Sequence, residues 1–477
     1  MKIKIQDFDL HQITLQTRLP FRYGIATMTR VPQVFLRLWA EVDGNTTVGI
    51  AADLLPPKWF TKNPVTTLEE EVAEMLQVIR HALVLAKGAE GESPFAIWRE
   101  MYRHQLDWGG VNKLPPLLAN FGTSLVERAL IEAVGRATGQ SFSQMLQSNL
   151  LGIRLGDIHP ELSERTPADF LPATPLPKII ARHTVGLADP LTEADIAPAD
   201  RLNDGLPQSL EASIQTYGLR HFKIKVSGDV TADQARLLEL ARIFEKLVPA
   251  DYLFTLDGNE HFKSLEDFRK FWTMLWTPSR LHDLRQHLCF VEQPLHRDVA
   301  LAATLQDELL QWPDRPAMII DESDAVLESL PAALRLGYSG TSHKNCKGIF
   351  KGIINRCLLS HRQREDRAAS LIMSGEDLCN VGPVALLQDL AVMAALGIQS
   401  VERNGHHYLA GLSQFPNSIQ QQILAHHDDL FRSSKAGWPT LRIEQGEIRL
   451  DSVNQSPFGV GFVLEAEQFE QVRQDQN

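Results

Sequence analysis

The sequence contains LFTLD at residues 253–257, CFVE at 289–292 and MIID at 318–321. Each is a short apolar run that ends in an acidic residue, namely Asp257, Glu292 and Asp321. The acids are 35 and then 29 residues apart, about one β-strand–α-helix unit each. Because the C-terminal ends of barrel strands meet at one mouth, we expect the three carboxylates to converge there.

Apolar runs of this kind alternate with helical stretches through the second half of the chain. Eight of them are candidate strands, at residues 179–185, 221–226, 252–256, 288–291, 317–320, 340–342, 370–373 and 398–401. The run at 340–342 is the weakest of these candidates because its composition is polar. Alternation of strand and helix is typical of a parallel sheet or barrel. We predict an α/β chain whose residues 179–415 form a (β/α)8-type barrel, a modified TIM barrel.

The first 150 residues have a different organisation. Strand patterns at residues 13–15 and 33–42 precede helical patterns at 68–85 and 114–146, which indicates an α+β capping domain. Prolines are frequent between residues 151 and 178, so we interpret that segment as a linker. Residues 416–477 contain two short strand patterns around Gly446, and we expect this segment to return to the cap.

Composition limits the class of protein. The 477 residues suit a barrel of roughly 250 residues plus a second domain. A net charge of -12 argues against a nucleic-acid partner, and the lack of any apolar run of about 18 residues argues against a membrane span. The four cysteines form no CxxC pair, which fits a reducing, cytoplasmic location. A small molecule is the expected partner, and a homo-oligomer remains open.

Two lysine motifs accompany the acids. In HFKIKV at residues 221–226 the side chains alternate, so Lys223 and Lys225 share the inner face of the predicted strand. Their mutual repulsion is expected to lower a lysine pKa towards the range of a working base. Lys344 lies 23 residues after Asp321, at the expected end of the sixth strand. Taken singly, the Lys223–Lys225 motif also fits a solvated edge strand, and Lys344 also fits a surface loop.

Three converging carboxylates repel one another unless a cation binds between them. Magnesium prefers such hard oxygen ligands and leaves room for water and substrate. A single acid after a strand equally fits a helix cap or a loop salt bridge. The prediction of a metal site therefore depends on all three acids occupying the same position, directly after consecutive strands.

The order of these motifs resembles the enolase superfamily, and within it the muconate-lactonizing-enzyme-like subgroup of the mandelate racemase/muconate lactonizing enzyme family. The matching stretches are Lys223-Ile224-Lys225, Asp257-Gly258-Asn259, Glu292-Gln293-Pro294, Asp321-Glu322-Ser323 and Lys344. Carried over by position, the resemblance implies Mg²⁺, or Mn²⁺, bound by Asp257, Glu292 and Asp321. It also implies an acid/base pair of Lys225 and Lys344, with Lys223 steadying the substrate carboxylate and depressing the pKa of Lys225.

The resemblance implies an isomerase or lyase that removes the proton beside a substrate carboxylate through a metal-stabilised enediolate. Racemisation or epimerisation, cycloisomerisation and syn-elimination all remain open. Two departures are Lys347-Gly348-Ile349 in place of a Gly-Gly pair, and a cap stretch at residues 48–52 that lacks the usual glutamate. The alternatives are a Schiff-base lysine barrel enzyme and a non-catalytic carboxylate-binding protein on the same fold.

Three further features have two interpretations each. Glu376, after the seventh predicted strand, either lines the site or is a loop acid or helix cap. The adjacent His406 and His407, after the eighth, either contact substrate or lie in a surface loop. Residues 21–23 and 58–60 of the cap either form a specificity lid or belong to the cap core.

Overall fold

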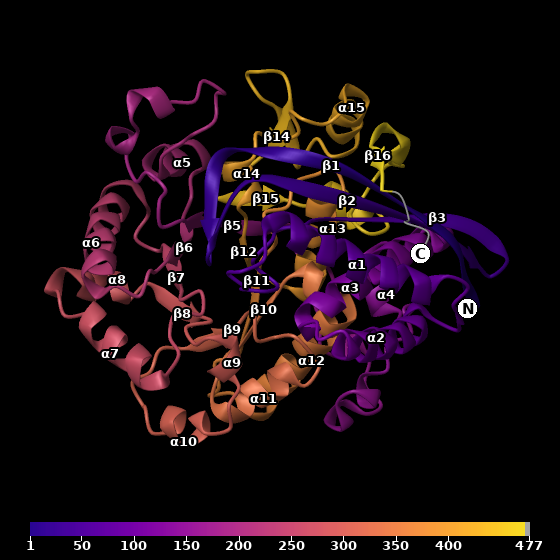
Figure 1. Ribbon diagram of the computed structural model, residues 1–477, viewed down its shortest axis with the longest axis horizontal. Coiled ribbons are helices and arrows are strands. Elements are labelled where there is room, and N and C mark those ends of the chain that lie inside the picture. The colour runs from indigo at the N-terminus through magenta and orange to yellow at the C-terminus, as the bar shows by residue number, and fades with distance from the viewer. Residues whose placement is uncertain (473–477) are drawn as a thin grey trace.

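The computed structural model describes residues 1–472 and contains a barrel and a cap (Figure 1). Eight parallel strands form the barrel, which closes because β12 pairs with β5. They are β5 (Lys178–Val185), β6 (His221–Lys225), β7 (Leu253–Asp257), β8 (Leu288–Glu292), β9 (Met318–Ile320), β10 (Gly340–His343), β11 (Ile372–Gly375) and β12 (Ser400–Glu402). The predicted fold class is therefore confirmed, and each of the eight predicted strands overlaps one of these.

Helices surround the barrel strands on the outside (Figure 1). The main ones are α5 (Leu210–Tyr217), α6 (Val230–Leu247), α7 (Leu265–Leu275), α11 (Ser329–Leu336), α12 (Ile349–Glu365) and α13 (Ala385–Leu396). Shorter helices are α8 (His282–Arg285), α9 (Arg297–Ala300), α10 (Leu305–Leu310) and α14 (Gly405–Tyr408). On β6, Phe222 stacks against Phe244 of α6 with ring centroids 4.4 Å apart. Because side chains alternate along a strand, Lys223 and Lys225 face the barrel interior.

The cap consists of an antiparallel sheet and helices. Its long strands are β1 (Ile3–Tyr23), β2 (Ala26–Val42) and β3 (Asn45–Leu54), with the short β4 (Glu90–Gly91) on the other edge of β1. Its helices are α1 (Leu68–Ala86), α2 (Pro94–Val111), α3 (Pro116–Thr138) and α4 (Phe142–Gln147). The far end of the β1–β2 hairpin reaches the barrel, where Phe21 stacks on Tyr408 of α14 (Figure 1).

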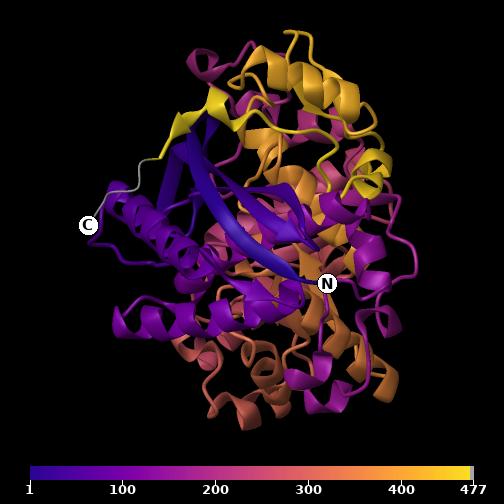
Figure 2. The same ribbon diagram turned by 90° about the vertical axis from the view of Figure 1, so that its right-hand side faces the viewer.

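The C-terminal segment contacts both units. It contains α15 (Asn417–His426), β13 (Phe431–Ser433), β14 (Pro439–Leu441), β15 (Glu447–Arg449), α16 (Asp451–Gln455) and β16 (Glu470–Gln471). β15 pairs antiparallel with barrel strand β5, whereas β16 pairs with β1 of the cap (Figure 2). Within residues 1–472, no helix combines the length and the hydrophobicity needed to cross a membrane.

Helix α3 is buried along most of its length and packs directly onto β3. The contact requires a glycine: a Cβ added to Gly49 would lie 1.9 Å from the backbone oxygen of Ala129 and 2.6 Å from the nitrogen of Ala133. The opposite side of α3 contacts the barrel, where Asn120 donates a hydrogen bond to the backbone oxygen of Ala325 (2.8 Å). The position of the cap over the barrel therefore depends on this helix.

We expect Gly49→Ala to lower the free energy of unfolding by about 1–3 kcal/mol or more, because backbone atoms cannot move away from the new methyl group. Urea denaturation followed by circular dichroism measures the change. The matched control is Gly110→Ala in α2, where an added Cβ meets no atom within 4 Å. That variant should be unchanged or stabilised by up to about 1 kcal/mol, and equal stabilities of the two variants would contradict the packing argument.

Candidate active site

The six residues predicted from sequence to form the site lie together at the C-terminal ends of strands β6 to β10. All six side chains are buried. The Lys223 ammonium lies 2.8 Å from Glu292 and 2.9 Å from Asp257. The Lys225 ammonium lies 2.6 Å from the same oxygen of Asp257 and donates to Asn259 at 3.1 Å. Asp257 therefore contacts both lysines of the β6 motif, through a hydrogen bond from Lys225 and an ion pair with Lys223.

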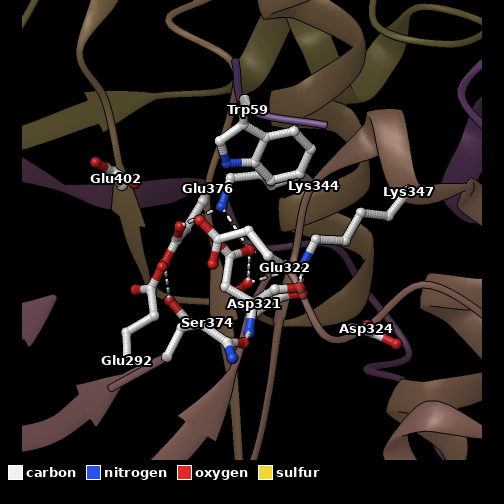
Figure 3. A network of polar contacts seen from close by, with 12 residues as sticks. Trp59, Glu292, Asp321, Glu322, Asp324, Lys344, Lys347, Ser374, Glu376 and Glu402 are labelled. Atoms are coloured by element: carbon white, nitrogen blue, oxygen red, sulfur yellow. Dashed lines mark hydrogen bonds and ion pairs between the residues drawn. The ribbon is translucent and has the colours of Figure 1, made fainter. Parts of the chain in front are cut away.

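Glu376 connects the two sides of the site. Its Oε2 accepts from Lys344 at 2.6 Å and from Lys223 at 2.9 Å, and its Oε1 accepts from Arg182 and Ser374. Figure 3 shows the Lys344 ammonium between the Trp59 ring and the carboxylates of Asp321 and Glu376. The structure therefore places Glu376 beside the predicted site residues and buries it, so it is not a loop acid at the surface. The signal was its position directly after β11, where it follows a strand as the other acids do.

Two more charged residues belong to this network, and the sequence argument did not assign them to it. Glu402, at the end of β12, accepts from Lys223 at 3.0 Å and from the Thr184 hydroxyl at 2.5 Å. The Lys347 ammonium lies 2.7 Å from the Asp321 carboxylate (Figure 3). The position of Glu402 after the eighth strand could have identified it, whereas Lys347 lies in a short turn with no strand to indicate its direction.

Three carboxylates in this network are spaced to hold a metal ion. Glu292, Asp321 and Glu376 can each offer one oxygen, and these atoms lie within 4.8 Å of one another. Oε2 of Glu292 is buried and has no hydrogen-bond partner among the residues that the structure describes. Hard carboxylate oxygens suit a divalent cation such as Mg²⁺ or Mn²⁺. Glu376 stands here in place of the predicted Asp257, whose role as a ligand stays a prediction.

Burial and neighbouring charges control the protonation of this cluster. Burial, reinforced by nearby Glu376, raises the pKa of Glu292 well above its ordinary value. Burial alone would lower the pKa of Lys344, but the carboxylates of Asp321 and Glu376 outweigh it and raise that pKa well above its usual range. The pKa of Lys223 is raised in the same way. The lowering expected from repulsion within the Lys223–Lys225 pair is not found at Lys223, because carboxylates surround its ammonium.

A small cavity of about 50 Å³ lies above the lysines. Its apolar side, which we call the roof, consists of Phe21, Tyr23, Met28, Pro56 and Trp59 of the cap and Leu378 of the barrel. Lys344 Nζ lies 5.2 Å from the centroid of the Trp59 ring. Ligand pockets commonly measure about 300–1,000 Å³, so a ligand of more than a few atoms requires the roof to move outward.

Some of the cap residues singled out in the sequence line the cavity, and others belong to the interior of the cap. Phe21, Tyr23 and Trp59 line the cavity, whereas Arg22 is exposed. Lys58 pairs with Glu71 at 2.8 Å inside the cap, and Phe60 packs against Phe121 of α3.

The backbone around Trp59 is held by a basic residue of the barrel. The Arg297 guanidinium donates to the backbone oxygens of Trp59 (3.0 Å) and Phe60 (2.7 Å). The same guanidinium forms an ion pair with Glu260. The roof is therefore attached to the barrel through a charged residue outside the cavity.

The two adjacent histidines are buried and do not line the cavity. His406 lies 3.2 Å from His183 on β5, and the His407 ring packs edge-on against the same side chain. The expectation that they lie in a surface loop is therefore wrong, because α14 turns them inward beneath the β1–β2 hairpin. Burial lowers the pKa of His407 to about 3, and burial together with the charge of His407 lowers that of His183 to about 3.

No family model matches this chain, and no curated protein matches it. Solved structures match it over nearly its whole length. Muconate lactonizing enzyme from Pseudomonas fluorescens, complexed with muconolactone, is 16% identical with a TM-score of 0.61, covering 97% of each chain. Dipeptide epimerase from Enterococcus faecalis V583, complexed with Mg and a dipeptide, is 15% identical with a TM-score of 0.59, covering 96% of this chain and 100% of that one.

A third match is 2-chloromuconate cycloisomerase from Rhodococcus opacus 1CP, which is 16% identical with a TM-score of 0.58 and covers 97% of this chain and 98% of that one. At these identities the likeness concerns the fold. The predicted architecture, a barrel with a cap, is therefore shared with these solved structures.

The ligand set can be tested with Mn²⁺ as the probe, its binding followed by electron paramagnetic resonance. We expect Glu376→Gln to weaken binding by at least about tenfold and Asp257→Asn to weaken it less, because Glu376 belongs to the group of carboxylates whose oxygens lie within 4.8 Å of one another. The exposed Glu308→Gln is the matched control. The reverse order, with the larger loss in Asp257→Asn, would favour the ligand set that the family resemblance implies.

The buried histidines predict a loss of stability in acid. An unfolded histidine binds a proton below about pH 6.5, whereas His183 and His407 do so only near pH 3. The stability is therefore complete above about pH 6.5 and falls as the pH drops towards 3, by up to about 1.4 kcal/mol per pH unit for each group.

Urea denaturation at about pH 7 and about pH 5 measures this slope. His407→Gln should reduce it, and the exposed His282→Gln should leave it unchanged. Equal slopes in the wild type and in His407→Gln would show that this histidine does not titrate on unfolding.

Proposed function

We propose that this protein is a magnesium-dependent enzyme that removes the proton next to the carboxylate of a small substrate. The observation that carries the proposal is the placement of Lys225 and Lys344. Both line the same cavity, and their strands, β6 and β10, are four positions apart in a closed barrel of eight. They therefore reach the cavity from opposite sides, so two faces of one carbon can each meet an ammonium or amine group.

The remaining residues have separate tasks in this proposal. A divalent cation at Glu292, Asp321 and Glu376 would stabilise negative charge developing on the substrate carboxylate. Lys225 accepts the proton at one face, and Lys344, which nearby carboxylates keep protonated, returns a proton to the other face. Lys223, which four carboxylates hold, supplies fixed positive charge beneath the substrate. The roof excludes water, which strengthens each of these interactions.

The similar structures support the reaction class without deciding between its members. Their names include a cycloisomerase, an epimerase and a lactonizing enzyme. One of them contains magnesium, which supports Mg²⁺ as the metal here. We favour racemisation or epimerisation because the lysines approach from opposite sides. Cycloisomerisation and syn-elimination use the same first step, and a small carboxylate is the partner in each case.

Exchange of the α-proton for deuterium in heavy water, followed by mass spectrometry with magnesium present, tests the proposal. The substrates would be N-acyl amino acids, dipeptides and other small carboxylic acids. We expect Lys225→Met and Lys344→Met each to lose exchange by on the order of 100-fold or more, because each removes an acid/base group. The exposed Lys263→Met is the matched control and should retain full exchange.

Exchange that persists in both lysine variants would contradict the proposal. Binding of a carboxylate without any exchange would favour the alternative, a binding protein on the same fold.

A further inference from the structure

We propose that the substrate is a monocarboxylate whose remaining part is apolar and uncharged, such as a phenyl or branched alkyl group held under the roof. This inference rests on the proposed function for the carboxylate end and adds the chemistry of the other end. It follows from which side chains face the cavity and from which nearby charges are already paired.

The cavity has one charged side and one apolar side. All the lysines that line it, Lys223, Lys225 and Lys344, lie at the ends of β6 and β10. The six roof residues face them, and every roof side chain is hydrophobic or aromatic. A ligand whose carboxylate lies among the lysines therefore presents its other end to the roof.

The roof offers little to a polar group. The Tyr23 hydroxyl is buried and donates to the backbone oxygen of Pro57 at 2.7 Å, so its ring alone faces a ligand. The other uncharged polar groups that line the cavity are the Trp59 indole N–H, the Cys379 thiol and the amides of Asn259 and Asn404. Burial raises the pKa of that thiol well above its usual value, so it carries no charge there. A phenyl or branched alkyl group can pack against such a surface, and burying it is favourable.

The cations around the roof cannot receive a second carboxylate. Lys62 lies 2.5 Å from Glu260, Arg297 lies 2.7 Å from the same carboxylate, and Arg403 lies 2.5 Å from Asp377. None of the three lines the cavity. The acids that do line it, among them Glu322 and Asp377, would repel a second carboxylate further.

The distal ammonium group of a substrate would meet the same apolar roof. Asp377 is paired with Arg403, and Glu322 is 3.9 Å from Lys62 at the edge of the charged side. Burying an ammonium against aromatic and aliphatic side chains without a hydrogen-bonded partner is unfavourable. The six roof residues therefore offer neither a cation to a distal carboxylate nor a carboxylate to a distal ammonium.

The test compares four ligands that share the same carboxylate end: N-acetyl-L-phenylalanine, N-acetyl-L-leucine, N-acetyl-L-glutamate and Nα-acetyl-L-lysine. Binding is measured by isothermal titration calorimetry with magnesium present, and α-proton exchange is measured separately. We expect the two apolar ligands to bind more tightly than the two charged ones by about tenfold or more. Equal or tighter binding of a charged ligand, or no binding of any of the four, would overturn this inference.

Variants of the roof connect the preference to these residues. Met28→Lys places a cation in the roof and should reduce the preference for the phenyl over the glutamate ligand by about tenfold. Trp59→Leu, which keeps the roof apolar, should retain the preference. Val65→Ala, exposed in the same cap loop, is the matched control. A preference unchanged by Met28→Lys in a folded protein would also overturn the inference.

The two measurements separate this inference from the proposed function. Selective binding of the apolar ligands without exchange would support the inference and contradict the proposed reaction. Exchange of the glutamate or lysine ligand at the rate of the phenyl ligand would support the reaction and overturn the inference.

Discussion

The constraint on which the site depends is the burial of several charges in one place. Lys223 is 2% exposed, and its ammonium lies within 3.0 Å of four carboxylates. A buried ion is tolerated only when partners replace the lost water, so each acid and each lysine here requires the others. The barrel meets this requirement because its parallel strands bring side chains from distant parts of the chain to one mouth.

The cap covers the site and supplies most of its apolar side. Helix α3 contacts both the cap sheet and the barrel, and the hairpin of β1 and β2 carries Phe21 and Tyr23 to the mouth. Arg297 attaches the segment around Trp59 to the barrel. The charged side of the cavity belongs to the barrel and most of the apolar roof to the cap, so the proposed reaction and the proposed substrate preference depend on different parts of the chain.

Much of the architecture was predictable because its signals are local. The eight strands could be recognised as short apolar runs with turns and helices between them, and alternation along β6 placed Lys223 and Lys225 on the same face. Position after a strand indicated Asp257, Glu292, Asp321 and Lys344 for the same reason. The burial of all six side chains agrees with that placement.

Only the tertiary structure decided how these groups are paired, because pairing depends on distances between strands that no local pattern encodes. It brought Glu376 close to Glu292 and Asp321, and it placed Asp257 in contact with two lysines. It also buried His406 and His407, which the sequence alone left open to solvent. The order of strands along the chain determines which residues reach the mouth, whereas closure of the barrel and docking of the cap determine which of them touch.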